Sequence, residues 1–535
     1  MGKGGCIKPN EQANAVAINN DRLTEISCSL LAKKNTIDEC WIAYEGNVYD
    51  VTKWLVKHPG GIRSIMSAAG SDASAVMKSL HTPKTLKTYM KRCRKVGKLV
   101  KDEELSEEMM TSLATDAVTD VEKMRDLNRL KAMTRREAIS KDFDDLNERL
   151  VREGWYEPQP WAYWATAIRV LALLSGGIGL ILFSQTLPND QAVLKGTALT
   201  LGSMSLGFYF QTVAFSGHDA GHGSITGSFS SDKVIGIIIG NLFTGIDMGW
   251  WKSTHNVHHS ATNSLHDDPD IQHMPLLCLD ERMGENRWST YHGKYMLLDA
   301  VGRFLLPYQH WYFYPVLGVA RINLYIQSVI YLIKTCPFFA NNNNIAGTSF
   351  IDEKSGKVKE KYAWPKQKNL MWVASFVSLC IFYTTMVKFF LSIGLIPGIY
   401  SFLVTHITAG LLHVQILLSH ICMHYCEDGP GTSGAISAPN GHEEAGYYEW
   451  QALSTMDIDC PPWMDWFHGG LQFQLEHHIF PRVPRWNLRK LCTLTDEIYA
   501  KYDVPVVRMS FIEANRVMLR HIAGVGANVA KTKSA

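Results

Sequence analysis

The chain has 535 residues, more than one domain usually needs; 46% of them are hydrophobic and only 19% are charged. Because soluble proteins carry about 25% charged residues, this deficit favours a membrane protein with soluble parts. The net charge of +2 is uninformative about partners, and no basic tract suggests that nucleic acid is one. Eleven cysteines without paired spacing indicate free thiols in a reducing compartment.

The N-terminal part predicts a small soluble module. No uninterrupted apolar segment of a secretory signal opens the chain, so we expect a tail over 1–19 in the cytosol. Residues 20–100 predict a compact module that begins with a β-hairpin near 41–51. His58 and His81 are the only histidines in the first 200 residues, and His58 begins a His-Pro-Gly-Gly turn. The two glycines of this turn let a flat ligand approach the backbone closely.

The rest of the chain alternates charged and apolar stretches. Residues 101–155 are charged with a helical pattern, which predicts a linker or surface helix. The short apolar run at 233–246 fits a re-entrant or interfacial segment, and 301–335 predicts amphipathic interfacial helices because polar residues interrupt it. About 20 apolar residues cross the hydrocarbon core, and four stretches reach that length. The four predicted spans are 165–186, 195–215, 370–388 and 398–419.

Four spans place three histidine-rich clusters on one face of the membrane. From a cytosolic N-terminus, two spans return the chain to the cytosol before the first two clusters, and two more return it before the third. A five-span chain would separate them. The clusters are His218 and His222, then His255, His258 and His259, then Gln474, His477 and His478.

The spacing within the clusters predicts a metal site. Residues i, i+3 and i+4 of a helix lie on one face, about 5–6 Å apart, so each cluster can direct its nitrogens to one point. A lone histidine pair is more often an ordinary core feature, but a repeated triplet has no packing rationale. Seven imidazoles and one amide exceed the four ligands that zinc usually takes. They suit two iron ions with positions left open for oxygen.

The N-terminal motifs together resemble a cytochrome b5 domain. They are Trp41, Tyr49-Asp50-Val51, His58-Pro59-Gly60-Gly61, Gly70, Asp72 and His81. The resemblance implies haem b, with His58 and His81 as the two axial ligands. Because both axial positions are then filled, the haem iron carries electrons and does not activate oxygen.

The three clusters, with Gln474 opening the third, resemble the membrane front-end desaturase family, whose members carry a fused cytochrome b5 domain. The implied fold is multi-domain: a small α+β cytochrome b5-like haem domain, followed over 156–500 by an all-α four-span membrane desaturase domain with a cytosolic diiron cap. The resemblance implies two non-haem irons, O2 as co-substrate and a membrane lipid as substrate. It also implies a further ligand at His420, although Ser419 departs from the usual Asn and His424 is an alternative one turn later.

The two predicted modules have complementary chemical roles. Protein acids and bases cannot deprotonate an unactivated methylene, whereas an oxidant generated at a metal can take its hydrogen. The fused haem would supply the electrons one at a time, and NAD(P)H-cytochrome b5 reductase is the expected donor. Asp268 and Asp270 are candidates to orient metal-binding histidines, with helix capping as the alternative. Glu476 lies off the ligand face, which favours a surface role.

Further motifs resemble sphingolipid Δ8 desaturases, which implies a ceramide or long-chain-base substrate. Acyl-lipid Δ6 desaturases share much of the pattern and remain an alternative, as does a lipid hydroxylase that uses the same oxidant. A membrane haem electron carrier is the non-enzyme alternative. The loss of a cluster histidine would have supported it, and none is missing. The motifs are Trp250-Trp251-Lys252 and the segments 263–265, 268–275, 308–310, 320–325 and 460–473.

The C-terminal tail, 501–535, predicts a location. It ends Lys531-Thr532-Lys533-Ser534-Ala535, which resembles the K-x-K-x-x signal that retrieves membrane proteins to the endoplasmic reticulum. Such a signal works only in the cytosol, where four spans place the C-terminus. We therefore predict a multi-pass protein of the endoplasmic reticulum membrane with both termini cytosolic.

Overall fold

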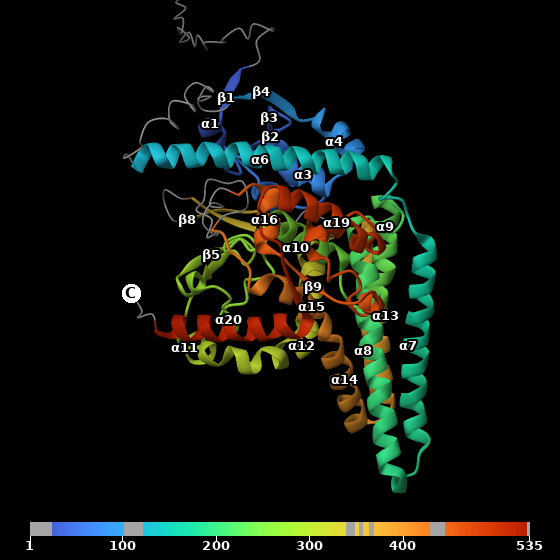
Figure 1. The fold of residues 1–535 in the computed structure, drawn as a ribbon. Helices are drawn as coiled ribbons and strands as arrows, with labels where there is room; N and C mark the ends of the chain where they lie inside the picture. Colours follow the sequence, from blue (N-terminus) through green and yellow to red (C-terminus); the bar gives the residue numbers. More distant parts are fainter. Residues whose placement is uncertain are drawn as a thin grey trace, which may run out of the picture.

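The computed structural model describes residues 24–100, 121–338, 348–352, 357–362, 369–427 and 445–531. The N-terminal tail, and all of the K-x-K-x-x segment except Lys531, lie outside the described residues. Figure 1 shows a small N-terminal domain above a helical body, from which long helices extend in one direction.

The N-terminal domain is α+β, as predicted. Its sheet has the order β1–β4–β3–β2, in which β1 runs parallel to β4 and the other neighbours are antiparallel. The predicted hairpin is present, and its turn residues Glu45 and Gly46 both have positive φ, 48° and 70°, as a tight two-residue turn requires. The elements are β1 (Glu25–Ser27), α1 (Cys28–Ala32), β2 (Trp41–Tyr44), β3 (Asn47–Asp50), α2 (Arg63–Met66), α3 (Ser74–Leu80), α4 (Pro83–Met90) and β4 (Arg94–Val100).

Helix α6 (Val121–Arg152) runs along the boundary of this domain and the body (Figure 1). The expected linker helix is present, but it is also part of the core. Its buried residues recur at helical spacing. Phe143 stacks on Tyr448 with ring centroids 4.5 Å apart, and Lys78 of the N-terminal domain pairs with Asp144 at 2.8 Å. The buried residues are Ile139, Phe143, Leu146 and Leu150.

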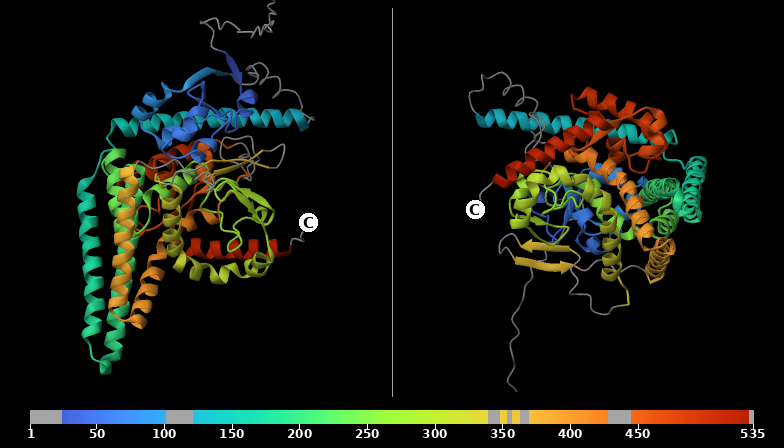
Figure 2. Two further views of the ribbon diagram at one scale, coloured as in Figure 1. Left: turned by 180° about the vertical axis from the view of Figure 1, so that it is seen from behind. Right: turned by 90° about the horizontal axis from the view of Figure 1, so that it is seen from below.

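Four long helices extend side by side from the body (Figures 1 and 2). The first two pack closely, because a Cβ added to Gly202 would lie only 2.8 Å from the carbonyl oxygen of Gly177. Small residues at such positions let two membrane helices approach. The four are α7 (Pro160–Thr186), α8 (Ala192–His222), α13 (Asn369–Ser392) and α14 (Leu395–Ala409), and α15 (Leu411–Ile421) continues α14 into the body.

Length and composition select four candidate spans among the described residues. Three of them contain predicted spans: Pro160–Thr186, Asn369–Ser392 and Leu395–Ile421. The fourth is Ala300–Lys334, which was predicted to be interfacial. A bent pair, formed by Phe229–Thr244 and Met248–Ser260 at 108° to each other, would add a fifth span if it crossed. Helix α8 contains the remaining predicted span, but small and polar side chains dilute its apolar residues.

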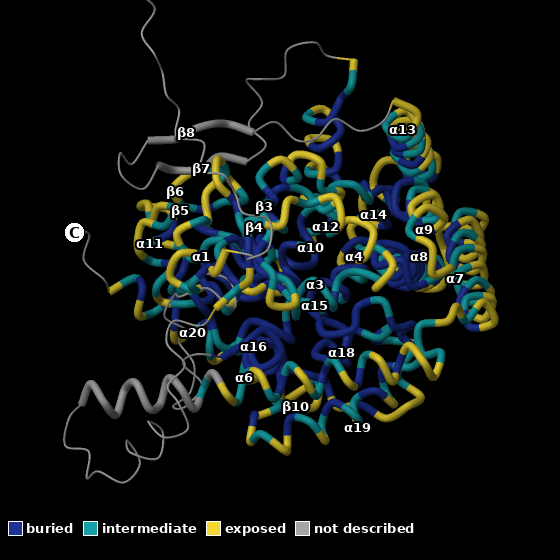
Figure 3. The backbone as a smooth tube through the Cα atoms, turned by 90° about the horizontal axis from the view of Figure 1, so that it is seen from above, coloured by how far each residue is buried: buried dark blue, intermediate teal, exposed yellow. Residues whose placement is uncertain are grey.

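The body consists of shorter elements. Figure 3 shows that α16 and α18 lie buried at its centre, while the outer side of α7 is exposed. Strands β9 and β10 pair in parallel and join two distant segments of the chain. The elements are α9 (Phe229–Gly236), η3 (Ile237–Thr244), α10 (Met248–Ser260), β5 (Arg287–Ser289), β6 (Lys294–Met296), α11 (Ala300–Leu305), α12 (Gln309–Lys334), β7 (Thr348–Asp352), β8 (Lys357–Tyr362), α16 (Tyr447–Ser454), β9 (Met456–Asp459), α17 (Asp465–His468), α18 (Gln474–Ile479), α19 (Arg485–Lys501), β10 (Val507–Ser510) and α20 (Phe511–Lys531).

Candidate functional site

His58 and His81 face each other in the N-terminal domain, with ring centroids 6.0 Å apart. Nδ1 of His58 lies 3.2 Å from the carbonyl of Gly61, and Nδ1 of His81 lies 3.0 Å from that of Met77. These contacts leave Nε2 of each ring available as a ligand. A metal bonded to two imidazoles at about 2 Å separates their centroids by about 6 Å. The pair therefore fits the iron of a haem.

Burial keeps these two imidazoles neutral. It lowers the pKa of His58, and it lowers the pKa of His81 to about 4. For His81, the charges of His58, Arg482 and Lys252 act in the same direction as burial. A neutral imidazole keeps the lone pair that an iron ligand needs, so both rings are ready to bind at neutral pH.

The predicted metal ligands converge from four helices of the body. Helix α8 ends at His222, because Gly223 adopts a left-handed φ of 74°. One group of ligand nitrogens, all within 4.8 Å of one another, comes from α8, α10 and α18. Nε2 of His218, His222 and His477 is buried without a hydrogen-bond partner in the described part of the chain. Buried polar atoms normally have partners, so this group fits a metal ion. Its members are His218, His222, His255 and His477.

A second group lies beside the first and contains His258, His420 and His478, whose ligand atoms are again within 4.8 Å of one another. Nδ1 of His420 lies 3.1 Å from the carbonyl of Ser454, and Nδ1 of His478 lies 2.9 Å from Oε1 of Gln451. These contacts fix both rings and direct Nε2 toward the centre of the group.

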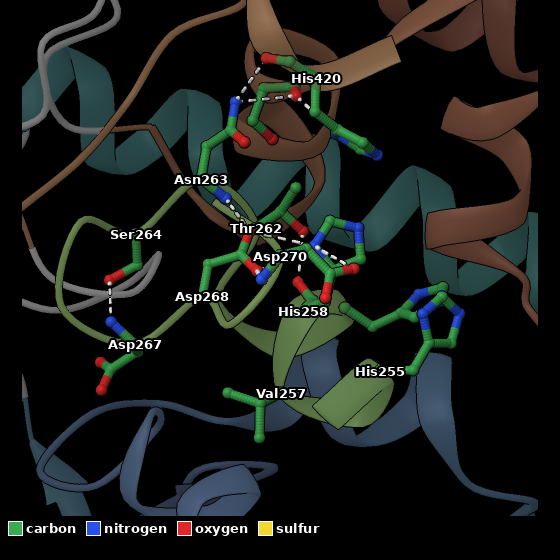
Figure 4. Close-up of polar contacts among 12 residues, drawn as sticks. His255, Val257, His258, Thr262, Asn263, Ser264, Asp267, Asp268, Asp270 and His420 are labelled. Carbon is green, nitrogen blue, oxygen red and sulfur yellow. Dashed lines mark hydrogen bonds and ion pairs between the residues drawn. The ribbon is translucent and has the colours of Figure 1, made fainter. Parts of the chain in front are cut away.

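A carboxylate fixes the third ring of this group. Nδ1 of His258 lies 3.0 Å from Oδ2 of Asp268, and Figure 4 shows Asp268 and Asp270 beside this histidine. Asp268 also accepts hydrogen bonds from the backbone N–H groups of Asn263 and Asp270, at 2.8 and 2.9 Å. The proposed orienting role of Asp268 therefore has the geometry it requires, whereas Asp270 lies farther away, at 3.8 Å.

His259 and Gln474 join the two groups. Nε2 of His259 lies 3.0 Å from Nε2 of His255, and its ring stacks on His478 with centroids 4.3 Å apart. The amide nitrogen of Gln474 lies 3.4 Å from His420 and 3.2 Å from His478, while its amide oxygen is buried without a partner among the described residues. All the predicted ligands thus meet in two adjacent groups, an arrangement that fits two metal ions.

His424 belongs to neither ligand group among the described residues, whereas His420 does. Glu476 was expected at the surface, but it is fully buried and accepts a hydrogen bond from the hydroxyl of Thr495 at 2.7 Å. That prediction was wrong, because the spacing identifies a helix face and not the segment that covers it.

Burial and neighbouring imidazoles hold the pKa of His477 and His478 well below its usual range.

The clustering also constrains the membrane crossings. His222 ends α8 and His420 lies near the end of α15, yet both lie in this cluster with the histidines of α10. Because His222 and His420 then lie on the same side of the membrane, an even number of crossings must separate these two residues. Helices α13 and α14–α15 supply two crossings. Neither Ala300–Lys334 nor the bent pair can then add a single crossing. In Figure 1, α11 and α20 run across the direction of the long helices, as interfacial helices do.

The N-terminal domain contacts the metal-ligand helices directly. The hydroxyl of Ser79, two residues before His81, donates to the carbonyl of His478 at 3.2 Å. The hydroxyls of Ser67 and Ser260 lie 2.9 Å apart, next to His259. The candidate haem site and the candidate metal centre are therefore adjacent parts of one folded chain.

Replacing Asp268 with asparagine should weaken metal binding by about 10- to 100-fold, because an amide no longer holds His258 as a carboxylate does. Iron retained after dialysis against a graded series of chelator concentrations measures the effect. Asp267→Asn is the matched control, since Figure 4 shows its side chain directed away from His258. Equal retention by both variants would contradict the role given to Asp268.

Comparison with known proteins identifies both parts of the chain. Residues 195–509 match the family model "Fatty acid desaturase", and residues 27–100 match "Cytochrome b5-like Heme/Steroid binding domain".

Curated relatives match nearly the whole chain. A "Delta(8)-fatty-acid desaturase" of Helianthus annuus is 32% identical over 95% of this chain and 92% of its own. A "Delta 8-(E)-sphingolipid desaturase" of Komagataella phaffii is 30% identical over 91% of each chain. An "Acyl-lipid (9-3)-desaturase" of Borago officinalis is 30% identical over 90% of this chain and 89% of its own. The chain therefore belongs to the fatty acid desaturase family, as a membrane-bound lipid desaturase that carries its own cytochrome b5-like domain.

Proposed function

We propose that this desaturase introduces a double bond at the Δ8 position of a sphingoid base, in ceramide or a free long-chain base. The observation that carries the proposal is the joining, in one chain, of a bis-histidine haem site and two histidine groups at the end of a membrane helix bundle. The Δ8 position is supported by the relatives from Helianthus annuus and Komagataella phaffii, whose names specify it.

The cofactors would be haem b at His58 and His81 and two non-haem irons at the two histidine groups. Bound there, the iron pair would supply an oxidant able to take hydrogen from unactivated methylenes. Each new double bond consumes one O2, two electrons and two protons, and releases two waters. Held by His58 and His81, the haem would supply those electrons one at a time.

The chain's own residues would hold and orient these groups. Imidazoles supply the ligand nitrogens, and the oxygens of Asp268, Ser454 and Gln451 fix the rings of the second group. Gln474 would complete that group through its amide oxygen, which is buried without a partner among the described residues. The buried position of both groups would exclude bulk water from the reacting carbon atoms.

The membrane arrangement supports a cytosolic source of electrons. With α7, α8, α13 and α14–α15 crossing, both histidine groups and the N-terminal domain share one face of the membrane, and we propose that this face is cytosolic. NAD(P)H-cytochrome b5 reductase would then reduce the haem. The C-terminal Lys531-Thr532-Lys533-Ser534-Ala535 supports residence in the endoplasmic reticulum.

An acyl-lipid substrate is the second candidate, favoured by the similarity to the Borago officinalis enzyme. Expression in yeast that lacks a Δ8 desaturase distinguishes the two, with mass spectrometry of long-chain bases and of fatty acid methyl esters from the same cells. We expect Δ8-unsaturated long-chain bases, absent when His477→Ala is expressed. Unsaturation confined to fatty acids would replace the sphingoid substrate, and hydroxylated products would assign the chain to hydroxylation.

Replacing His420 with alanine should abolish product as completely as replacing a histidine of the three clusters, because its ring belongs to the second group. His424→Ala should be milder, since that residue lies outside both groups. Product formation by each variant, normalised to protein amount, gives the ranking. The opposite ranking would move the ligand to His424.

A further inference from the structure

The backbone carbonyl of His478 is a point where the two domains share hydrogen bonds. The last carbonyls of a helix have no partner within it, and His478 lies in the last turn of α18. The hydroxyl of Ser79, from the cytochrome domain, donates to this carbonyl at 3.2 Å. The hydroxyl of Tyr447, from α16, lies 3.2 Å from the same carbonyl and 3.2 Å from Oγ of Ser79. All three residues are buried, so bulk water does not compete for these contacts.

On the cytochrome side, Ser79 is held close to the candidate haem ligand His81. Both residues lie at the end of α3, with only Leu80 between them. The backbone N–H of His81 donates to the carbonyl of Met77 at 3.0 Å, and Nδ1 of its ring lies 3.0 Å from the same carbonyl. The imidazole that would bind the haem iron and the hydroxyl of Ser79 therefore belong to one fixed turn of the chain.

On the desaturase side, the accepting carbonyl belongs to a candidate metal ligand. The ring of His478 is one of the second histidine group, and Oε1 of Gln451 fixes its orientation at 2.9 Å. A route from His81 through Leu80 and Ser79 thus reaches His478 along covalent bonds interrupted by a single hydrogen bond. Its two ends are the residues that would hold the two cofactors.

Two other contacts between the domains lack this continuity. The hydroxyls of Ser67 and Ser260 lie 2.9 Å apart, but Ser67 is distant along the chain from both His58 and His81. Asn256, next to the ligand His255, approaches the cytochrome domain at Gly60, where its amide nitrogen would lie 3.4 Å from an added Cβ. That approach is a van der Waals contact and not a hydrogen bond.

We propose that Ser79 is the positioning residue that couples the haem at His81 to the metal centre at His478 for electron transfer. The inference rests on the proposed haem and iron cofactors. Electron tunnelling weakens steeply across van der Waals gaps and much less along covalent and hydrogen bonds, so the route with one hydrogen bond and no gap carries electrons best. Each transfer oxidises the haem iron from Fe(II) to Fe(III) and reduces one iron of the centre from Fe(III) to Fe(II).

The test follows a single electron in the full-length protein that holds haem and ferric iron, without O2 and without lipid. A light flash generates a flavin radical that reduces the haem, and the later loss of ferrous haem absorbance records transfer to the metal centre. We expect Ser79→Ala to slow this loss several-fold, with haem and iron content unchanged. Ser79→Thr keeps the hydroxyl and should retain the rate of the unsubstituted protein.

Two control variants separate this role from docking and from helix capping. Ser67→Ala removes another hydrogen bond between the domains, and Tyr447→Phe removes a hydroxyl from the same carbonyl while leaving Ser79 in place. Both should transfer the electron at the unsubstituted rate. Slowing by either control equal to that of Ser79→Ala would overturn the proposal, as would an unchanged rate in Ser79→Ala.

A further variant covers the case in which Ser79→Ala fails to hold haem or iron. Ser79→Cys fills a similar space, but its thiol is a weak donor, so it should slow the transfer as well. An unslowed Ser79→Cys would overturn the proposal.

Failure of the cofactor assignments would give different results in the same assay. No haem absorbance in the unsubstituted protein would reject the haem ligation. An equal loss of ferrous haem absorbance before and after a chelator removes the non-haem iron would reject the metal centre as the electron acceptor. Because no lipid is present, a wrong substrate assignment would leave every rate unchanged.

Discussion

Replacing His477 with alanine should reduce double-bond formation at least about a hundredfold while leaving haem absorbance unchanged, because changes that merely touch a ligand already cost 10- to 100-fold. The Nε2 atom of His477 is buried without a partner among the described residues, in the group that His218, His222 and His255 complete. Alanine removes one of the four ligand nitrogens of that group. Product yield and iron content, measured on the same purified sample, record the effect.

The same result is expected for every cluster histidine. His292→Ala is the matched control, since His292 is exposed, belongs to neither histidine group among the described residues, and places Nε2 3.2 Å from the carbonyl of Gln272. Near-normal turnover in any two of the seven variants would show that the ligand assignment is wrong. The seven are His218, His222, His255, His258, His259, His477 and His478.

Replacing His58 or His81 with alanine should remove the haem absorbance and abolish activity while leaving the non-haem iron bound. Each histidine would supply one of the two axial bonds, and their ring centroids lie 6.0 Å apart, as one iron between them requires. The metal groups belong to other helices and keep their ligands. Absorbance, iron content and product are measured on the same sample, with no cytochrome b5 added.

Activity that survives in either haem-ligand variant would show that electrons reach the metal centre by another route. Adding a separate soluble cytochrome b5 provides the control. Partial recovery on that addition would show that the metal centre is intact and that only the fused donor is lost. Loss of iron together with haem would instead mean that the two sites depend on each other for folding.

Ligand spacing predicted the metal centre because the geometry of a helix converts sequence separation into a shared face. The i, i+3, i+4 pattern predicted one target point for His255 and His258, but the structure divides them, since His255 groups with His477 and His258 groups with His478. The residues that orient the imidazole rings could not be predicted from the sequence in this way. Gln451 and Ser454 belong to another helix, α16, and no sequence spacing connects them to His478 or His420.

Composition gave wrong predictions of burial where segments distant in the sequence cover a residue. The charged character of α6 predicted a linker, yet its stripe from Ile139 to Leu150 packs in the core. Glu476 was assigned to the surface because its own helix turns it away from the ligands, while Thr495 of α19 covers it. The stretch Ala300–Lys334 is long and apolar enough to span. Only the shared position of His222 and His420 shows that it does not add a crossing.

The central claim is that one chain holds both an electron-carrying haem and a two-iron centre. Its most direct test is the metal and haem content of the purified full-length protein, with total iron by atomic emission and haem by the pyridine haemochrome. We predict one haem and two non-haem irons per chain, with the non-haem iron lost in His477→Ala and the haem retained. A single non-haem iron, zinc in its place, or a haem protein without other iron would contradict the account.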